Sequence, residues 1–164
     1  MFLLLFVGFL AAGWIHALAT GPRTRRRFAE LLLVYCLVGY FGLVMLATAV
    51  FTLAAPEHSA ASHGWRVSAD NPFQQFAGVA FGAMALAAIL AVWLRGLYLV
   101  GPAVCWALIF LGATWIHLAD PSARGQAMTF HRVLHVFGSH GLMSVVLIVL
   151  LVAYMSPERA NRPE

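Results

Sequence analysis

Apolar residues in this chain gather in five long blocks that short polar segments separate. The blocks cover residues 2–20, 30–53, 72–94, 97–119 and 133–155. An α-helix rises about 1.5 Å per residue, so about 20 apolar residues cross a hydrocarbon core of roughly 30 Å. Blocks of this length predict an all-α fold, an integral membrane bundle of five transmembrane helices. At 164 residues the chain fits one transmembrane domain, residues 1–164.

Residues at the block boundaries are those that start and end helices. Asn71 is a preferred N-cap residue, and Pro72 suits the first helical position. Arg95 and Gly96 leave only a very short turn between the third and fourth blocks. We therefore expect these two blocks to form an antiparallel hairpin.

Arginine positions give the predicted bundle an orientation, because short cytoplasmic loops carry the excess of basic residues. With the N-terminus outside and the C-terminus in the cytoplasm, seven arginines fall on the cytoplasmic side: Arg23, Arg25, Arg26, Arg27, Arg95, Arg159 and Arg162. Three fall on the outer side: Arg66, Arg124 and Arg132. This bias predicts that orientation, in the inner (cytoplasmic) membrane of a bacterium.

Composition narrows the range of partners. Charged residues make up 10% of the chain, against roughly 25% in soluble domains, so too few are present to cover a surface in water. All ten basic residues are arginine, and four of them lie between Arg23 and Arg27. A basic face with interleaved aromatic residues is absent from the sequence, which excludes nucleic acid as a partner. Membrane lipids are the expected partners, since anionic headgroups suit such a cluster.

Small residues in the blocks indicate where helices approach one another. Gly78 and Gly82 form a GxxxG pair, a spacing that lets two helix backbones come close. We expect packing within the monomer, and contact with another membrane subunit is the alternative. The two cysteines, Cys36 and Cys105, lack CxxC spacing and are expected to be small buried residues. The five tryptophans, Trp106 among them, are expected in an interfacial belt.

Histidines are the main candidates for chemistry, because ionisable residues in membrane segments are costly. Six of the seven fall on or near the predicted outer face: His58, His63, His117, His131, His135 and His140. His131 and His135 are four residues apart and share a helical face, as do His117 and Asp120 at a spacing of three. These four residues can form a zinc or copper site. His140 lies about 140° around an α-helix from His135.

A haem held by one histidine from each of the last two blocks is the other cofactor that this arrangement allows. The cofactor-binding candidates are then His117, His135 and His140, with Gln74 and Gln75 lining a polar cavity near them. The competing interpretation places the histidines at the interface, bonded to loop carbonyls, headgroups or water. In the same interpretation the two glutamines cap a helix end or bond to a neighbouring helix.

Catalytic signatures are absent from the sequence. It contains no HExxH, GxSxG or Walker motif, and no pair of carboxylates within the blocks. We therefore expect a non-catalytic accessory or structural subunit of a membrane complex, or a binder of lipid or a small ligand. The first alternative is a membrane protein that binds a transition metal or haem through its outer histidines. The second is a small oligomeric transporter or channel.

Three stretches, spread over most of the chain, carry a resemblance to a known family. They are Arg27-Phe28-Ala29-Glu30 leading into residues 31–38, Gly64-Trp65 followed by Asn71-Pro72-Phe73-Gln74, and Gly112-Ala113-Thr114-Trp115-Ile116-His117. Together they resemble the DUF6790-type family of small multi-span bacterial membrane proteins of unknown function. The family has an acidic residue shortly after the proline-phenylalanine-glutamine element, whereas Gln75-Phe76-Ala77 offers none here. The resemblance implies a multi-span fold, singles out Gln74 and His117, and implies no activity.

Overall fold

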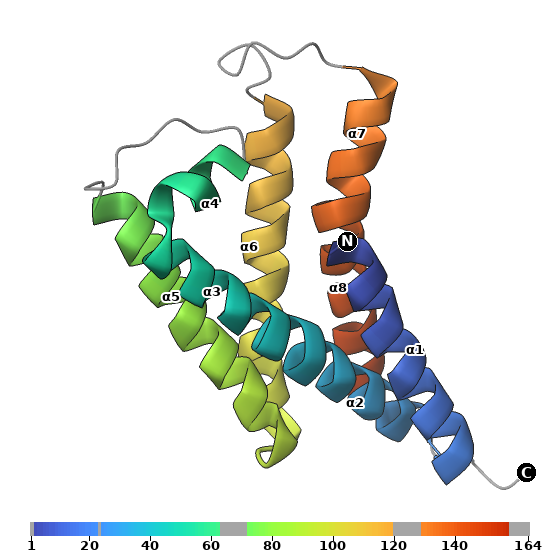
Figure 1. The fold of residues 1–164 in the computed structure, drawn as a ribbon. Coiled ribbons are helices and arrows are strands. Elements are labelled where there is room, and N and C mark those ends of the chain that lie inside the picture. The colour runs from blue at the N-terminus through green and yellow to red at the C-terminus, as the bar shows by residue number, and fades with distance from the viewer. Residues whose placement is uncertain (1, 23, 63–71, 120–128, 158–164) are drawn as a thin grey trace, which may run out of the picture.

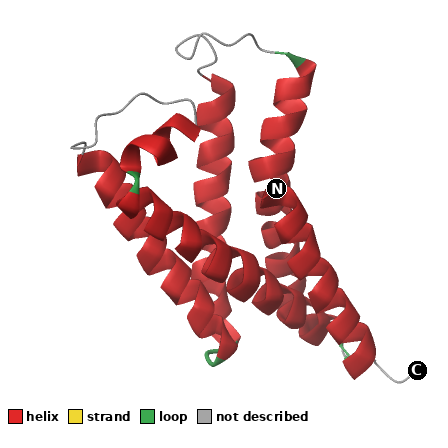
Figure 2. Cartoon of the chain, viewed as in Figure 1, coloured by secondary structure: helices red, strands yellow, loops and turns green. Residues whose placement is uncertain are grey.

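The structure is a bundle of helices, as the apolar blocks predict. The computed structural model describes residues 2–22, 24–62, 72–119 and 129–157. Every regular element within these ranges is helical (Figure 2). The all-α prediction is therefore confirmed for the part of the chain that the structure describes.

The elements follow one another in the order shown in Figure 1. They are α1 (Phe2–Thr20), α2 (Arg25–Tyr35), η1 (Cys36–Val44), α3 (Met45–Ala54), α4 (Pro56–Ser62), α5 (Pro72–Ile89), η2 (Leu90–Val92), η3 (Gly96–Leu99), α6 (Val100–Ala119), α7 (Phe130–Val136), η5 (Phe137–Gly141) and α8 (Leu142–Met155). The segments η1 and η5 are π-helical, and η2 and η3 are short 3₁₀ turns. Because η1 and η5 continue their neighbours without a break, α2–η1–α3 and α7–η5–α8 are each one continuous helical run.

Four helices are long and apolar enough to cross a membrane. They are Phe2–Thr20, Arg25–Ala54, Pro72–Val92 and Gly96–Ala119. These match the first four predicted spans, and they give the chain the build of an integral membrane protein. In the last run, the apolar helix Leu142–Met155 is by itself shorter than a span.

The second span begins five residues earlier than the apolar block predicted. Thr24 caps α2, because its Oγ1 accepts a hydrogen bond from the backbone N of Arg27 at 3.2 Å. Just before it, Gly21 has a φ of +58° and donates its N–H to the carbonyl of Ala17, which ends α1. The arginine-rich segment is therefore partly helical, and the turn between α1 and α2 is tight.

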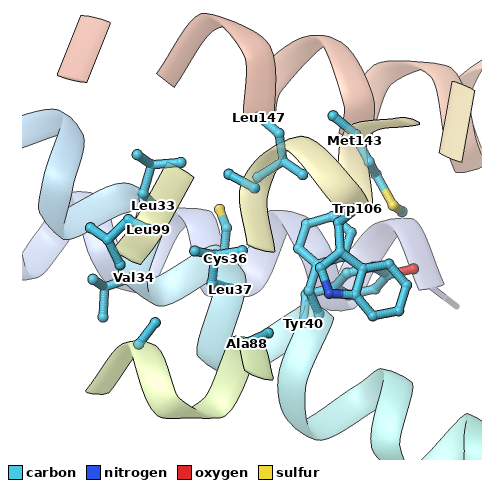
Figure 3. Close-up of a cluster of buried hydrophobic side chains, with 14 of the residues drawn as sticks. Leu33, Val34, Cys36, Leu37, Tyr40, Ala88, Leu99, Trp106, Met143 and Leu147 are labelled. Carbon is cyan, nitrogen blue, oxygen red and sulfur yellow. The ribbon is translucent and has the colours of Figure 1, made fainter. Parts of the chain in front are cut away.

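The helices pack around the π-helical segment η1 at the centre of the bundle. Its side chains Cys36, Leu37, Tyr40 and Phe41 are all buried. They meet residues of α5, α6 and α8, including Trp106, in the core that Figure 3 shows. In Figure 1 the run α2–η1–α3 crosses the bundle obliquely, with α1 and α5 packed against it.

Two sequence expectations for this core are wrong. Trp106 is fully buried among Phe41, Phe81 and Phe110, so it belongs to the core and not to an interfacial belt. Cys105, its neighbour on α6, lies on the exposed surface of the bundle, because successive helical residues point about 100° apart. Cys36 is buried, as expected.

Glycines set the closest approaches between helices. A Cβ on Gly39 would overlap the ring of Phe9 from α1, and one on Gly42 would lie 2.6 Å from Cγ1 of Ile89 on α5. Gly78 packs inside the chain in the same way, because a Cβ there would lie 2.8 Å from Cγ of Leu53 on α3. These glycines let α1, α5 and the central run pack closely.

Candidate functional site

Buried polar side chains bond to one another between α3, α4 and α5. Thr52, Ser59 and Gln74 expose 5% or less of their surfaces. The hydroxyls of Thr52 and Ser59 lie 2.9 Å apart, and Nε2 of Gln74 donates to Oγ of Ser59 at 3.5 Å. Gln74 therefore bonds to a neighbouring helix, as one of the two sequence interpretations holds, whereas Gln75 is exposed.

A second polar contact joins α6 to α8. Ser144 is fully buried, and its hydroxyl donates to the carbonyl of Ala107 at 3.1 Å. The same hydroxyl lies 3.3 Å from the carbonyl oxygen of His140, one turn earlier in its own helical run. This contact joins the two helices one turn along the helical run from His140.

His117 and His140 come together between the end of α6 and η5. Their ring centroids are 5.2 Å apart with an interplanar angle of 32°. The ring of Phe110 also contacts His140, with its centroid 5.6 Å from that of the imidazole. Both imidazoles are only partly buried. The pair joins one histidine from each of the last two predicted spans, which is the juxtaposition that a shared ligand requires.

The remaining predicted ligands cannot be placed beside this pair. Asp120 lies outside the described residues, and the side chains of His131 and His135 are likewise not described. Among the side chains that the structure does describe, no group of three or more His, Cys, Asp and Glu residues is placed to hold a metal ion. The metal site of His117, Asp120, His131 and His135 stays a prediction.

A hollow of about 280 Å³ lies at the opposite end of the bundle, between α1 and α2. It is lined by His16, Thr20, Pro22, Arg27 and Leu31. The tight turn described above creates it, because this turn places the last two turns of α1 against the first two turns of α2. The hollow combines a guanidinium, an imidazole and a hydroxyl with apolar walls.

Hydrogen bonds position the polar groups around this hollow. The hydroxyl of Tyr35 lies 3.0 Å from Nδ1 of His16, which orients the imidazole. Nη1 of Arg27 donates to Oε2 of Glu30 at 2.9 Å. Arg26, one residue earlier, lies over the ring of Tyr154 at 5.2 Å and so ties α2 to the end of α8.

Comparison with known families decides where the chain belongs. The sequence model of the Family of unknown function (DUF6790) matches residues 1–160. The chain belongs to this family. No curated protein and no solved structure matches the chain. The match confirms the resemblance carried by the three stretches above.

Membership of DUF6790 assigns no activity. The candidate sites can therefore be compared only by the geometry and chemistry of their side chains. Sequence reasoning identified His117 and His140 as cofactor-binding candidates, and it placed His140 about 140° around a regular α-helix from His135. It missed the α1–α2 hollow. The available signal was His16 and Thr20 at a spacing of four, followed directly by the arginine cluster.

Proposed function

We propose that this protein is a non-catalytic integral membrane protein that binds lipid on the outside of its bundle, as an accessory or structural component of the membrane. The interior is filled by an apolar and aromatic core. The buried polar side chains in the described residues are Thr52, Ser59, Gln74 and Ser144, all uncharged and all used in helix–helix contacts or helix bonds.

The observation that carries the proposal is the contrast between this closed interior and the outer surface. Large apolar side chains project outward along the spans. Leu97 exposes 84% of its surface, Leu4 76% and Trp115 72%. Soluble proteins rarely expose so many large apolar side chains, whereas in a bilayer the acyl chains cover them. A ligand would therefore bind on the surface of the bundle that faces lipid.

The proposal includes a topology of five spans in a bacterial inner membrane, with the N-terminus outside and the C-terminus in the cytoplasm. Continuity of the run from Phe130 to Met155 supports a fifth crossing, because the run as a whole is long enough for one. The arginines near the α1–α2 turn, together with Arg95, support the orientation. Contacts with other membrane subunits are part of the same proposal, but Gly82 faces α3 of its own chain, where an added Cβ would lie 3.7 Å from Cβ of Ala49.

Purification in a mild detergent followed by native mass spectrometry tests the proposed function. We expect the folded chain to retain phospholipid or a further membrane subunit in a defined ratio. A strictly monomeric chain that carries no lipid and no partner would contradict the proposal.

Binding of a transition metal or haem is the second candidate, favoured by the closeness of His117 and His140. Two imidazoles that share a tetrahedral zinc ion at about 2.0–2.1 Å have ring centres roughly 5 Å apart. The observed separation of 5.2 Å meets this condition. Metal analysis and a visible absorption spectrum of the purified protein test it. A colourless protein without bound metal, unchanged by His117→Ala or His135→Ala, would contradict this candidate.

An oligomeric transporter or channel has the least support. An ion pathway within a membrane uses charged side chains that face a cavity. Among the described residues the side chains buried in the spans carry no charge. No observation in the structure favours this function over lipid binding.

A further inference from the structure

We propose that the hollow between α1 and α2 binds the phosphate group of an anionic phospholipid. The inference rests on the proposed lipid-binding function and deepens it by naming the site and the headgroup class. The hollow lies where α1 ends and α2 begins. Figure 1 shows these two helix ends at the lower right of the bundle. Both helices are long and apolar enough to cross a membrane, so their ends lie at the level of lipid headgroups.

The size of the hollow suits a headgroup. Its volume of about 280 Å³ is just below the roughly 300–1,000 Å³ of pockets that hold whole drug-sized ligands. The acyl chains of a lipid would therefore remain outside it. Ile15 and Leu18 lie within one turn of His16 on α1 and expose about two thirds of their surfaces, 66% and 67%. They lie about 100° and 160° around α1 from His16, so they add apolar surface on neighbouring faces of the helix, outside the hollow.

Arg27 is the group that would bind the phosphate directly. A guanidinium has five N–H donors in a planar fork that matches phosphate geometry, and the hydrogen bond to Glu30 is made by Nη1. The side chain of Arg27 exposes 59% of its surface, so it is accessible to a ligand in the hollow. Glu30 exposes only 13% of its side chain and holds the guanidinium at this place.

His16 provides a second polar group on the facing helix. When the Tyr35 hydroxyl donates to Nδ1, the proton of a neutral imidazole is on Nε2, which then serves as a donor. In that tautomer the hollow has one donor group from each helix, Arg27 from α2 and His16 from α1. Two donor groups on opposite walls can contact different oxygens of one phosphate.

Charge at this end of the bundle selects an anion. Arg25, Arg26 and Arg27 occupy successive positions at the start of α2, and Glu30 forms an ion pair with Arg27. Clusters of arginine next to a span bind anionic lipids. Pro22 and Leu31 add apolar walls to the hollow, which favours a lipid headgroup at the membrane surface over a free phosphate ion.

Native mass spectrometry of the full chain in mild detergent tests the site. Short-chain phosphatidylglycerol is titrated into wild-type protein, Arg27→Gln and Arg95→Gln. Arg95 is an exposed arginine in the turn between η2 and η3 and does not line the hollow, so it is the matched control. We expect Arg27→Gln to weaken phosphatidylglycerol binding roughly tenfold, and Arg95→Gln to weaken it less than about twofold. Phosphatidylcholine should bind more weakly and respond equally little to both substitutions.

A second variant tests the site even if Arg27→Gln fails to fold. Thr20→Phe adds bulk to the wall of the hollow without changing charge, and it should also weaken phosphatidylglycerol binding. Equal losses in Arg27→Gln and Arg95→Gln, or none in Arg27→Gln and Thr20→Phe, would overturn the site while leaving lipid binding intact. Displacement of the lipid by an equal concentration of inorganic phosphate would make free phosphate the ligand and also overturn the inference. Absence of any bound lipid would contradict the proposed function itself.

Discussion

The imidazole of His140 lies between two other rings, those of Phe110 and His117, at centroid distances of 5.6 and 5.2 Å. The contact joins the π-helical segment η5 to the C-terminal part of α6. Such a row of rings stabilises the contact between two helices, and it places two histidines within reach of one ligand.

The ring contacts of His140 predict how its substitutions affect stability. His140→Ala removes both ring contacts and should lower the free energy of unfolding by about 0.5–1.5 kcal/mol per ring pair. His140→Phe keeps an aromatic ring at this position and should cost clearly less. Thermal unfolding in detergent measures both. Equal losses for the two variants would mean that polar bonds of the imidazole, and not its ring contacts, stabilise the helices.

The hydrogen bond from Ser144 to the carbonyl of Ala107 predicts a second effect. Hydrogen bonds between membrane helices contribute about 0.6 kcal/mol on average, and up to about 1.7 kcal/mol. Ser144→Ala should therefore lower the free energy of unfolding by this amount. Among the residues that the structure describes, the exposed hydroxyl of Ser156 bonds to the carbonyl of Val152 in the last turn of α8, so Ser156→Ala is the control and should have little effect. Equal free energies of unfolding for the two variants would mean that the α6–α8 hydrogen bond does not measurably stabilise the bundle.

The close approach of Gly39 to Phe9 predicts a steric effect. Gly39→Ala places a methyl group against the ring of Phe9 and should cost about 1–3 kcal/mol, the usual range for overpacking. The cost should shrink in the background of Phe9→Ala, because the smaller side chain leaves room. Gly101 has no atom within 4 Å of an added Cβ, so Gly101→Ala should not destabilise the protein. An undiminished cost in the double variant would place the clash elsewhere.

Local signals in the sequence were enough to predict most span boundaries. The first span ends at Thr20 and the third begins at Pro72, as the apolar blocks and the proline indicate. The second span starts at Arg25 because Thr24 caps the helix there. Hydropathy measures only how apolar a segment is, so it gives no sign of a cap. The arginines of α2 were therefore assigned to a loop although they lie on a helix.

Features that depend on contacts between distant segments could not be predicted in this way. Position 140 was placed about 140° from position 135 by assuming α-helical geometry. In a π-helix the hydrogen bonds link residues five apart, so η5 changes the face on which His140 lies. Trp106 was assigned to the interface from its residue type, whereas it packs against Phe41 of η1 and Phe81 of α5, which lie far from it in the sequence. Similarly, the α1–α2 hollow exists only once the two helices are packed.

The central claim is that this membrane bundle binds anionic lipid, and the thermal stability of the delipidated protein tests it most directly. A ligand that binds only the folded state raises the free energy of unfolding according to its concentration relative to Kd. At a tenfold excess over Kd, phosphatidylglycerol should raise the melting temperature of the wild-type protein by about 3–6 °C. Phosphatidylcholine should raise it less, and Arg27→Gln should remove most of the difference between the two lipids. A melting temperature that responds equally to both lipids, or to neither, would contradict the account.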